Sequence, residues 1–370
     1  MSENARNGGI QKCEENISEK KKKVEKFPIL KLPDLVREMV IRLMDPVEIF
    51  DFSQTSKRMH RTVKRSCRHK TYHLHLQASL IYQAALYPPT YPAIPAEPAR
   101  FRFQSLNGET ERDPKYDRHV GNFQKIHANF QEEKGLYFFH KSHWEITKEL
   151  IAELQNLMNI KFQQVRIFLD GIENRDHKPL IEWLNTFPNG IKLSYIYGDL
   201  VSNENMVDLM QNYQCRDTLR FYGRLRGFQI DPLPLKATDL RIDYTHWMTV
   251  ENVLQMDNVV AFKLGNAQHF TDVDYNVILK AIISGALPKM VYVHLELKRR
   301  YDRDVICQDI PLIQENSERL FSRYDKPHPD IGGFHFNLDN GDLGSIFFYM
   351  NARPGQPSTD IGIIVWRPDA

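Results

Sequence analysis

Six short runs of β-type residues recur through the middle of the chain, and their spacing restricts the fold more than any other feature. The runs are Val165–Leu169, Ile191–Tyr197, Thr218–Tyr222, Asp239–Tyr244, Val259–Leu264 and Met290–Leu297. Helix-like stretches lie between several of them, at Lys178–Thr186, Asn203–Asn212, Val250–Gln255 and Val273–Ile283. A strand followed by a helical return, repeated along the chain, predicts an α/β architecture for residues 136–300.

Two α/β architectures fit this recurrence. The central apolar residues of successive runs lie 20 to 31 residues apart, close to the unit of a leucine-rich-repeat solenoid. A doubly wound parallel sheet also alternates strands with helices. We favour a curved repeat array, and because the asparagine ladder of the leucine-rich repeat is missing, we expect it to be degenerate.

Residues 301–370 have a different pattern. Gly333–Leu338 alternates apolar and polar residues, Asn340-Gly341 is a strong hairpin turn, and Ile346–Tyr349 has strand propensity. Ile361–Trp366 adds a further apolar strand. We therefore expect a small C-terminal β cap that covers the open edge of the array.

Residues 27–70 predict a separate unit of three short helices. Pro33 suits the first turn of a helix, Asp45-Pro46 ends that helix and starts a second, and a third begins near Ser56. The first helix carries apolar residues at helical spacing, namely Val36, Met39, Val40, Leu43 and Met44. Three short helices make a very small core, so we expect another surface to complete it.

The remaining segments are expected to be a disordered tail and a connecting region. Residues 1–26 hold few large apolar groups and predict a disordered tail, whose run Lys20–Lys23 is either a nuclear address or a solvated end. Residues 71–135 predict a connecting region. Within it, prolines recur every third residue in the segment 88–98, which is either a stiff linker or a ligand for an SH3-type domain. We favour the linker.

Composition indicates a soluble protein of the cytoplasm and/or the nucleus. No apolar run is long enough to span a membrane, and the polar N-terminus lacks the apolar region of a secretory signal. The cysteines are scattered singly, without a C-x-x-C pair, which fits a reducing compartment. They are Cys13, Cys67, Cys215 and Cys307.

The sequence does not indicate an enzyme. It contains no P-loop, no dinucleotide-binding glycine motif, no H-E-x-x-H and no G-x-S-x-G. His140, His143 and His294 lack cysteine or carboxylate partners at metal-ligand spacing. We expect no metal, no cofactor and no catalysis. An enzyme of unknown class in the repeat region is a third hypothesis.

One charge feature stands out from a chain whose net charge is only +2. The segment Lys57–Lys70 contains seven lysines or arginines and no acidic residue. A basic helix of this kind can follow the phosphates of a nucleic acid, although it lacks interleaved aromatic groups. As a solvated outer face of the third helix, or as a contact to an acidic partner, the segment needs no further feature. A nucleic-acid-binding protein using residues 57–70 is therefore the alternative function.

The helical unit resembles an F-box over Leu32–Met59. The matching positions are Leu32-Pro33, Val36, Val40-Ile41, Met44, Asp45-Pro46, Ile49-Phe50, Phe52-Ser53 and Lys57-Arg58. The departures are Thr55, where an aliphatic residue is usual, and Met59, where tryptophan is common. The region Asp239–Leu297, with Trp247-Met248-Thr249 leading into a helix, is similar to the type 2 F-box-associated domain of nematode-type F-box families.

These resemblances imply a substrate-recognition subunit of an SCF-type (cullin–RING) ubiquitin ligase, acting in ubiquitin-dependent protein degradation. The F-box would bind a Skp-type adaptor, itself bound to a cullin scaffold, and the downstream domain would bind a target protein. The expected adaptor-binding residues are Leu32, Pro33, Val36, Val40, Ile41, Met44, Ile49 and Phe52. The candidates for the target-binding face, each alternatively a core residue, are Tyr195, Tyr197, Tyr222, Tyr244 and Trp247.

Overall fold

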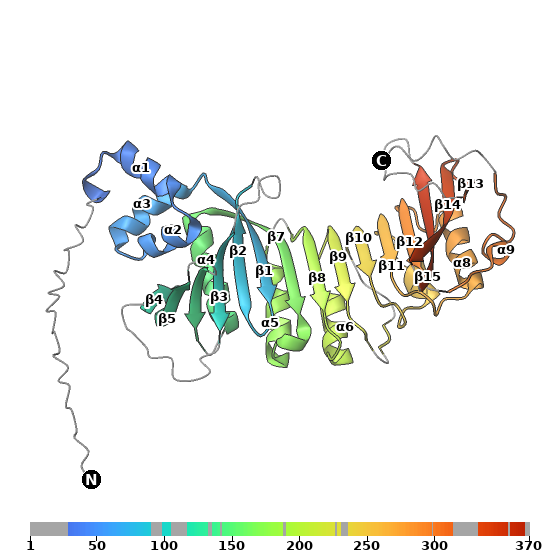
Figure 1. Ribbon diagram of the computed structural model, residues 1–370, viewed down its shortest axis with the longest axis horizontal. Helices are drawn as coiled ribbons and strands as arrows, with labels where there is room; N and C mark the ends of the chain where they lie inside the picture. Colours follow the sequence, from blue (N-terminus) through green and yellow to red (C-terminus); the bar gives the residue numbers. More distant parts are fainter. Residues whose placement is uncertain are drawn as a thin grey trace, which may run out of the picture.

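Figure 1 shows the computed structural model, a long sheet with a small helical unit at one end. The structure describes residues 29–89, 98–104, 117–131, 135–140, 143–187, 190–225, 228–230, 236–297, 299–313, 332–353 and 356–366. The tail predicted at residues 1–26 lies outside these ranges, as do residues 90–97 of the proline-rich segment 88–98.

The helical unit begins with a short 3-10 turn, η1 (Ile29–Lys31), and continues with α1 (Asp34–Leu43), α2 (Pro46–Ser53) and α3 (Lys57–Cys67). Asp45 caps α2, since its carboxylate accepts hydrogen bonds from the backbone N–H groups of Val47 (2.7 Å) and Glu48 (2.9 Å). The Glu48 carboxylate in turn accepts from the Asp45 N–H (2.9 Å). Ser56 caps α3, since its hydroxyl accepts a hydrogen bond from the Met59 N–H (3.1 Å). These caps fix the helix starts where the sequence predicts them.

The described strands form one 15-stranded sheet. Its central strands are β1 (Thr71–Ala78), β7 (Asn159–Phe168), β8 (Leu193–Tyr197), β9 (Thr218–Tyr222), β10 (Asp239–Ile242), β11 (Ala261–Leu264) and β12 (Tyr292–Glu296). From β7 to β12 the strands lie in chain order, and each pairs in parallel with the next. Within β7 to β12 the order has no reversal of the kind that marks a doubly wound sheet.

Helices follow most of these strands. These helices are α5 (Asn174–Leu184), α6 (Asn203–Asn212), α7 (Val250–Leu254) and α8 (Asp272–Ile283). A further helix, α4 (His143–Leu157), precedes β7. Alternate strand residues are buried with the helices in one core; Ile196 and Leu240, for example, are fully buried. The intervening positions, such as Tyr195 and Arg241, are only half-buried. One face of the parallel sheet is therefore packed, and the other is open.

The structure corrects the interpretation of residues 71–135 as a connecting region. Besides β1, they contain β2 (Tyr82–Tyr87), β3 (Ala99–Gln104), β4 (Asp117–Val120) and β5 (Phe123–Gln131). With β6 (Gly135–Phe139) these strands extend the sheet beyond β1, beside the helical unit. The alternating burial of β1, in which Leu74 and Leu76 face the core, shows the strand pattern that the prediction missed.

The C-terminal strands extend the sheet at its other end. After α9 (Arg303–Ile306) come β13 (Gly332–Asn337), β14 (Leu343–Arg353) and β15 (Gln356–Trp366). β15 pairs antiparallel with β12, and β14 and β13 continue outward (Figure 1). Gly341, at φ 90°, lies in the tight turn between β13 and β14, where a residue with a Cβ is strained. These strands thus occupy the edge that β12 would otherwise expose.

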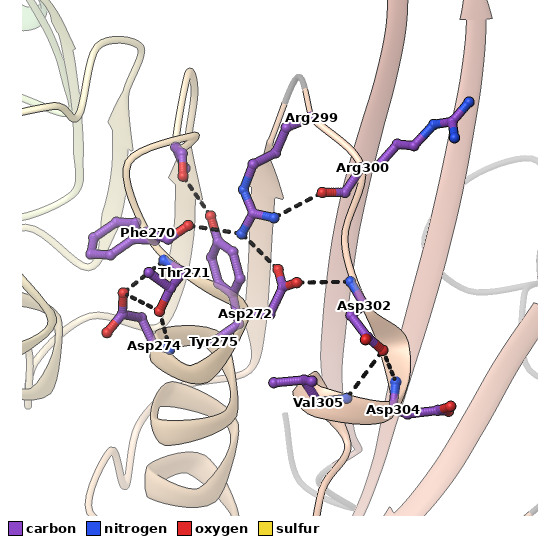
Figure 2. A network of polar contacts seen from close by, with 11 residues as sticks. Phe270, Thr271, Asp272, Asp274, Tyr275, Arg299, Arg300, Asp302, Asp304 and Val305 are labelled. Carbon is purple, nitrogen blue, oxygen red and sulfur yellow. Dashed lines mark hydrogen bonds and ion pairs between the residues drawn. The ribbon is translucent and has the colours of Figure 1, made fainter.

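A network of polar contacts fixes the connection between β12 and α9 (Figure 2). The Arg299 guanidinium donates hydrogen bonds to the Phe270 carbonyl (2.8 Å) and to the Asp272 carboxylate (2.6 Å) at the start of α8. The other Asp272 oxygen accepts from the Asp302 N–H (2.8 Å), and the Asp302 side chain caps α9. These contacts hold the connection against α8, so we assign this charged cluster a structural role.

Candidate functional site

The outer face of α1 is an exposed apolar surface. Leu35, Val36, Met39 and Leu43 are 70%, 42%, 58% and 87% exposed; we refer to these four side chains as the α1 stripe. Residues four positions apart lie above one another on a helix, so Leu35, Met39 and Leu43 form a continuous row. A cluster of exposed apolar side chains on one helix indicates an interaction surface.

The opposite face of α1 packs inside the protein. Ile41 is fully buried, and Arg37 is buried beside it, paired with Asp34 and donating a hydrogen bond to the Leu30 carbonyl (3.4 Å). On α2, Phe50 packs edge-on against Phe101 (ring centroids 5.8 Å apart) and Phe138 (6.2 Å) of the sheet. The helical unit therefore completes its core against the neighbouring sheet while the α1 stripe stays exposed.

The predicted adaptor-binding residues divide between these two environments. Pro33 and Val36 are exposed, and Leu32, Val40, Met44 and Phe52 are half-buried. Ile41 and Ile49 are 0% exposed and have no surface to offer a partner, which corrects their assignment to the interface. Met44 and Phe52 line an open cavity of about 560 Å³ between α2 and β4.

Sequence reasoning missed Leu35 and Leu43 as surface residues for a physical reason. The apolar residues of α1 cover more than half of its circumference, and the sequence alone does not show which side packs inward. The helical spacing of Leu35, Met39 and Leu43 is the signal that groups them. Only the burial of Ile41 shows that this group faces outward.

The basic segment 57–70 forms the outer face of α3 and its C-terminal end. Lys64 Nζ donates to Asn156 Oδ1 (2.5 Å), Arg65 lies 4.0 Å from Asp34, and Lys70 Nζ donates to the Met44 carbonyl (3.3 Å). Burial lowers the pKa of Lys70 below its usual range. Part of the basic segment therefore binds its own neighbours, and the remaining exposed cations include Lys57, Arg58 and Arg61.

A second surface lies on the open face of the sheet, where the structure gathers most of the predicted target-binding tyrosines. Tyr197 stacks between Phe168 (ring centroids 4.4 Å apart) and Tyr222 (5.0 Å), with the rings within about ten degrees of parallel. Tyr195 lies 6.2 Å from Tyr222. Burial raises the pKa of the Tyr197 hydroxyl. Three predicted tyrosines therefore form one aromatic cluster on β8 and β9.

Arginines alternate with these rings. Arg166 and Arg220 each lie 5.4 Å from the centre of the Tyr195 ring, and Arg241 lies 5.9 Å from that of Tyr222. Just after the ends of β9 and β10, Arg224 lies 4.6 Å from the centre of the Tyr244 ring and donates a hydrogen bond to its hydroxyl (3.0 Å). The sequence shows the tyrosines, but the register that places arginines beside them comes only from the structure.

Trp247 does not belong to this surface. It is only 5% exposed and packs edge-on against Phe228 (5.1 Å) and Phe221 (6.5 Å) on the packed side of the sheet. Together with Met248 it lines a cavity of about 600 Å³. The prediction that Trp247 contacts a target is therefore corrected: it is a core residue.

Two features of the described residues bear on metal binding and catalysis. Among these residues, no group of three or more metal-binding side chains comes together. Ser345 Oγ and His335 Nδ1 are 2.7 Å apart, but both residues are buried, so a substrate cannot reach the pair. Among the helices that the structure describes, none has both the length and the apolar character needed to cross a membrane.

Comparison with known proteins identifies the helical unit. Residues 29–71 match the family model of the F-box domain, a range that covers η1 and α1 to α3. Searches of the curated proteins and of the solved structures found no match. The α1 stripe lies within the matched range, as do the caps of α2 and α3. The chain therefore carries an F-box domain at residues 29–71, followed by a strand-rich α/β region.

Proposed function

We propose that the chain is the substrate-recognition subunit of an SCF-type ubiquitin ligase. F-box proteins are generally non-catalytic substrate receptors, and an F-box implies binding to a Skp-type adaptor. The observation that carries the proposal is the α1 stripe, four exposed apolar side chains on one helix of the F-box domain. A soluble partner that covers this stripe removes apolar surface from water.

The proposed adaptor surface combines the α1 stripe with the predicted residues that keep exposed area. Full burial of one leucine or methionine side chain contributes about 1.5–3 kcal/mol, so the stripe alone can supply much of the binding free energy. Around it lie Leu32, Pro33, Val40, Met44 and Phe52. Ile41 and Ile49 support the surface from inside the domain.

The proposed target-binding surface is the open face of the sheet, with Tyr195, Tyr197, Tyr222 and Tyr244. We interpret the strand-rich region as a degenerate leucine-rich-repeat-like array of the F-box-associated type 2 class, with residues 136–300 as the array and 301–370 as its cap. The sequential parallel order of β7 to β12 supports this interpretation. An open sheet face lined by aromatic and charged groups is suited to binding another protein.

In this function the chain carries out no covalent step. It holds a target protein close to the conjugating enzyme on a cullin scaffold, and this raises the effective concentration of the reacting groups. The target's identity is independent of the F-box and is set by the side chains of the sheet face. The complex would act in the cytoplasm and/or the nucleus.

Affinity purification of the tagged full chain, with the proteasome blocked, tests the proposal. The expected result is co-purification of a Skp-type adaptor and a cullin, together with ubiquitinated proteins. A Leu32→Ala/Pro33→Ala variant should recover less adaptor, since both residues flank the α1 stripe. Purification without any Skp-type adaptor, from cells that contain one, would reject the proposal.

A further inference from the structure

The open face of strands β7 to β10 places four side chains in one row. Strand register aligns Arg166 with Tyr195, Tyr195 with Arg220, and Arg220 with Arg241. Neighbouring strands lie about 4.8 Å apart, so the row is about 14 Å long. We refer to this row, together with Tyr197 and Tyr222 beside it, as the arginine–tyrosine face.

The positive charge of this face is only partly compensated. Arg241 forms an ion pair with Asp243 (Nε–Oδ1 2.9 Å). Among the described residues, no carboxylate forms an ion pair with Arg166 or Arg220. Both guanidinium groups lie beside the Tyr195 ring, and that of Arg166 also donates hydrogen bonds from Nε (2.7 Å) and Nη2 (3.2 Å) to the Gln164 side-chain oxygen. Two further acids lie near this face: Asp239 accepts a hydrogen bond from Thr218 Oγ1 (3.5 Å) in the adjacent row, and the charge of Glu296 acts on Arg241. Like charges on neighbouring strands repel, so a bound anion would relieve this repulsion.

The aromatic rings of the face are already covered on their flat sides. Tyr197 lies between Phe168 and Tyr222, and Tyr195 lies between Arg166 and Arg220. A nucleobase stacks on an uncovered aromatic ring, and these rings do not offer one. Side chains stand roughly perpendicular to a sheet, so the groups presented to solvent are guanidinium N–H and phenol O–H donors. Such a surface is suited to carboxylates.

We propose that the arginine–tyrosine face binds a carboxylate-rich, extended segment of the target protein, an inference that rests on the proposed receptor function and names the chemistry of its target. The planar guanidinium of arginine donates two parallel hydrogen bonds to one carboxylate. Arg166 and Arg220 are two strands apart, about 10 Å. Acidic side chains two to four residues apart in an extended segment span about 7–13 Å, which brackets this separation.

Fluorescence anisotropy with the full chain and a labelled peptide of alternating glutamate and serine tests this inference. The wild-type chain should bind the peptide, and R166Q/R220Q should weaken binding at least tenfold. The matched control, R58Q/R61Q, removes the same charge from the exposed side of α3 and should change the affinity less than twofold. Equal losses in the two variants would overturn the inference, because binding would then follow net charge alone.

Two competing probes separate the proposed ligand from other anions. Tighter binding of a single-stranded oligonucleotide, lost in R166Q/R220Q, would overturn the inference in favour of nucleic acid. Binding only after the peptide's serines are phosphorylated would overturn it in favour of a phosphopeptide. Thermal melting checks that R166Q/R220Q is folded. If it is not, the single variant R220Q carries the test, with a loss of at least threefold expected and an unchanged affinity overturning the inference.

The same variants distinguish this inference from the receptor proposal. R166Q/R220Q should still co-purify with the Skp-type adaptor, because Arg166 and Arg220 lie on the sheet and not in the F-box domain. A wild-type chain that recruits the adaptor but does not bind the acidic peptide would reject the inference alone. A wild-type chain that binds the peptide but no adaptor would reject the receptor proposal alone.

Discussion

Asp51 of α2 and Arg118 of β4 form a bidentate salt bridge between the F-box domain and the sheet. Arg118 Nε lies 2.7 Å from Asp51 Oδ1, and Arg118 Nη2 lies 3.1 Å from Oδ2. The hydrogen bonds to Asp51 raise the pKa of Arg118. Together with the contacts of Phe50 on Phe101 and Phe138, this pair fixes α2 against the sheet. The orientation of α2 relative to the sheet is thereby set.

The first prediction concerns this salt bridge. Asp51→Asn should lower the free energy of unfolding by about 1 kcal/mol, since the pair is charge-assisted but partly exposed to water. A double-mutant cycle with Arg118→Gln, measured by urea denaturation, should give a coupling free energy of about 0.5–1 kcal/mol. Additive effects of the two substitutions would show that the bridge does not couple the F-box domain to the sheet.

The second prediction compares two phenylalanines of α2. Phe50 is fully buried between α2 and the sheet, so Phe50→Ala should cost about 3–5 kcal/mol of stability through lost burial and a cavity. Phe52 is half-buried and faces the open cavity beside β4, so Phe52→Ala should cost less than half as much. Urea denaturation followed by circular dichroism measures both. Equal costs would contradict the assignment of Phe50 to the core and Phe52 to the surface.

The third prediction is a pH dependence from His75. Burial, with the charges of Arg166 and His73, lowers the pKa of His75 to about 4. An unfolded chain binds a proton on this histidine below about pH 6.5, but the folded protein does so only below about pH 4. The wild-type protein should therefore lose at most about 3 kcal/mol of stability from this group as the pH falls between these values.

A His75→Gln variant isolates that loss. Its free energy of unfolding should fall less steeply than that of the wild type between pH 6.5 and pH 4. Urea denaturation at a series of pH values measures the difference. Parallel curves for wild type and His75→Gln would contradict the shifted pKa.

Local sequence signals predicted the helices and strands that have clear patterns. Asp45-Pro46 and Ser56 mark helix starts because their side chains cap the backbone N–H groups of the next turn. The runs around Phe221 and Ile242 became neighbouring parallel strands because each alternates one buried and one outward residue. These signals depend on residues close together in the sequence, which is why they can be found without a structure.

Long-range contacts account for what the sequence did not show. Ile41 and Ile49 look like interface residues in sequence, but they are buried because α1 and α2 pack on a shared core. The sequence suggests that Trp247 is exposed, but in the folded protein Phe228 and Phe221 pack against it. Likewise, the placement of Arg166 and Arg220 beside Tyr195 depends on strand register. Each of these facts depends on which distant segments meet.

The most direct test of the account is the affinity of the full chain for a purified Skp-type adaptor, measured by isothermal titration calorimetry. Leu35→Asp/Leu43→Asp places two charges in the α1 stripe and should weaken binding at least a hundredfold, because a buried, unpaired charge is costly. Both residues are exposed, so thermal stability should change little.

The matched control is Leu200→Asp, because Leu200 is 87% exposed, as Leu43 is, but lies in the sheet region. This variant should bind the adaptor as the wild type does. A Leu35→Asp/Leu43→Asp variant that is folded and binds the adaptor with wild-type affinity would contradict the central claim that the α1 stripe is the adaptor-binding surface.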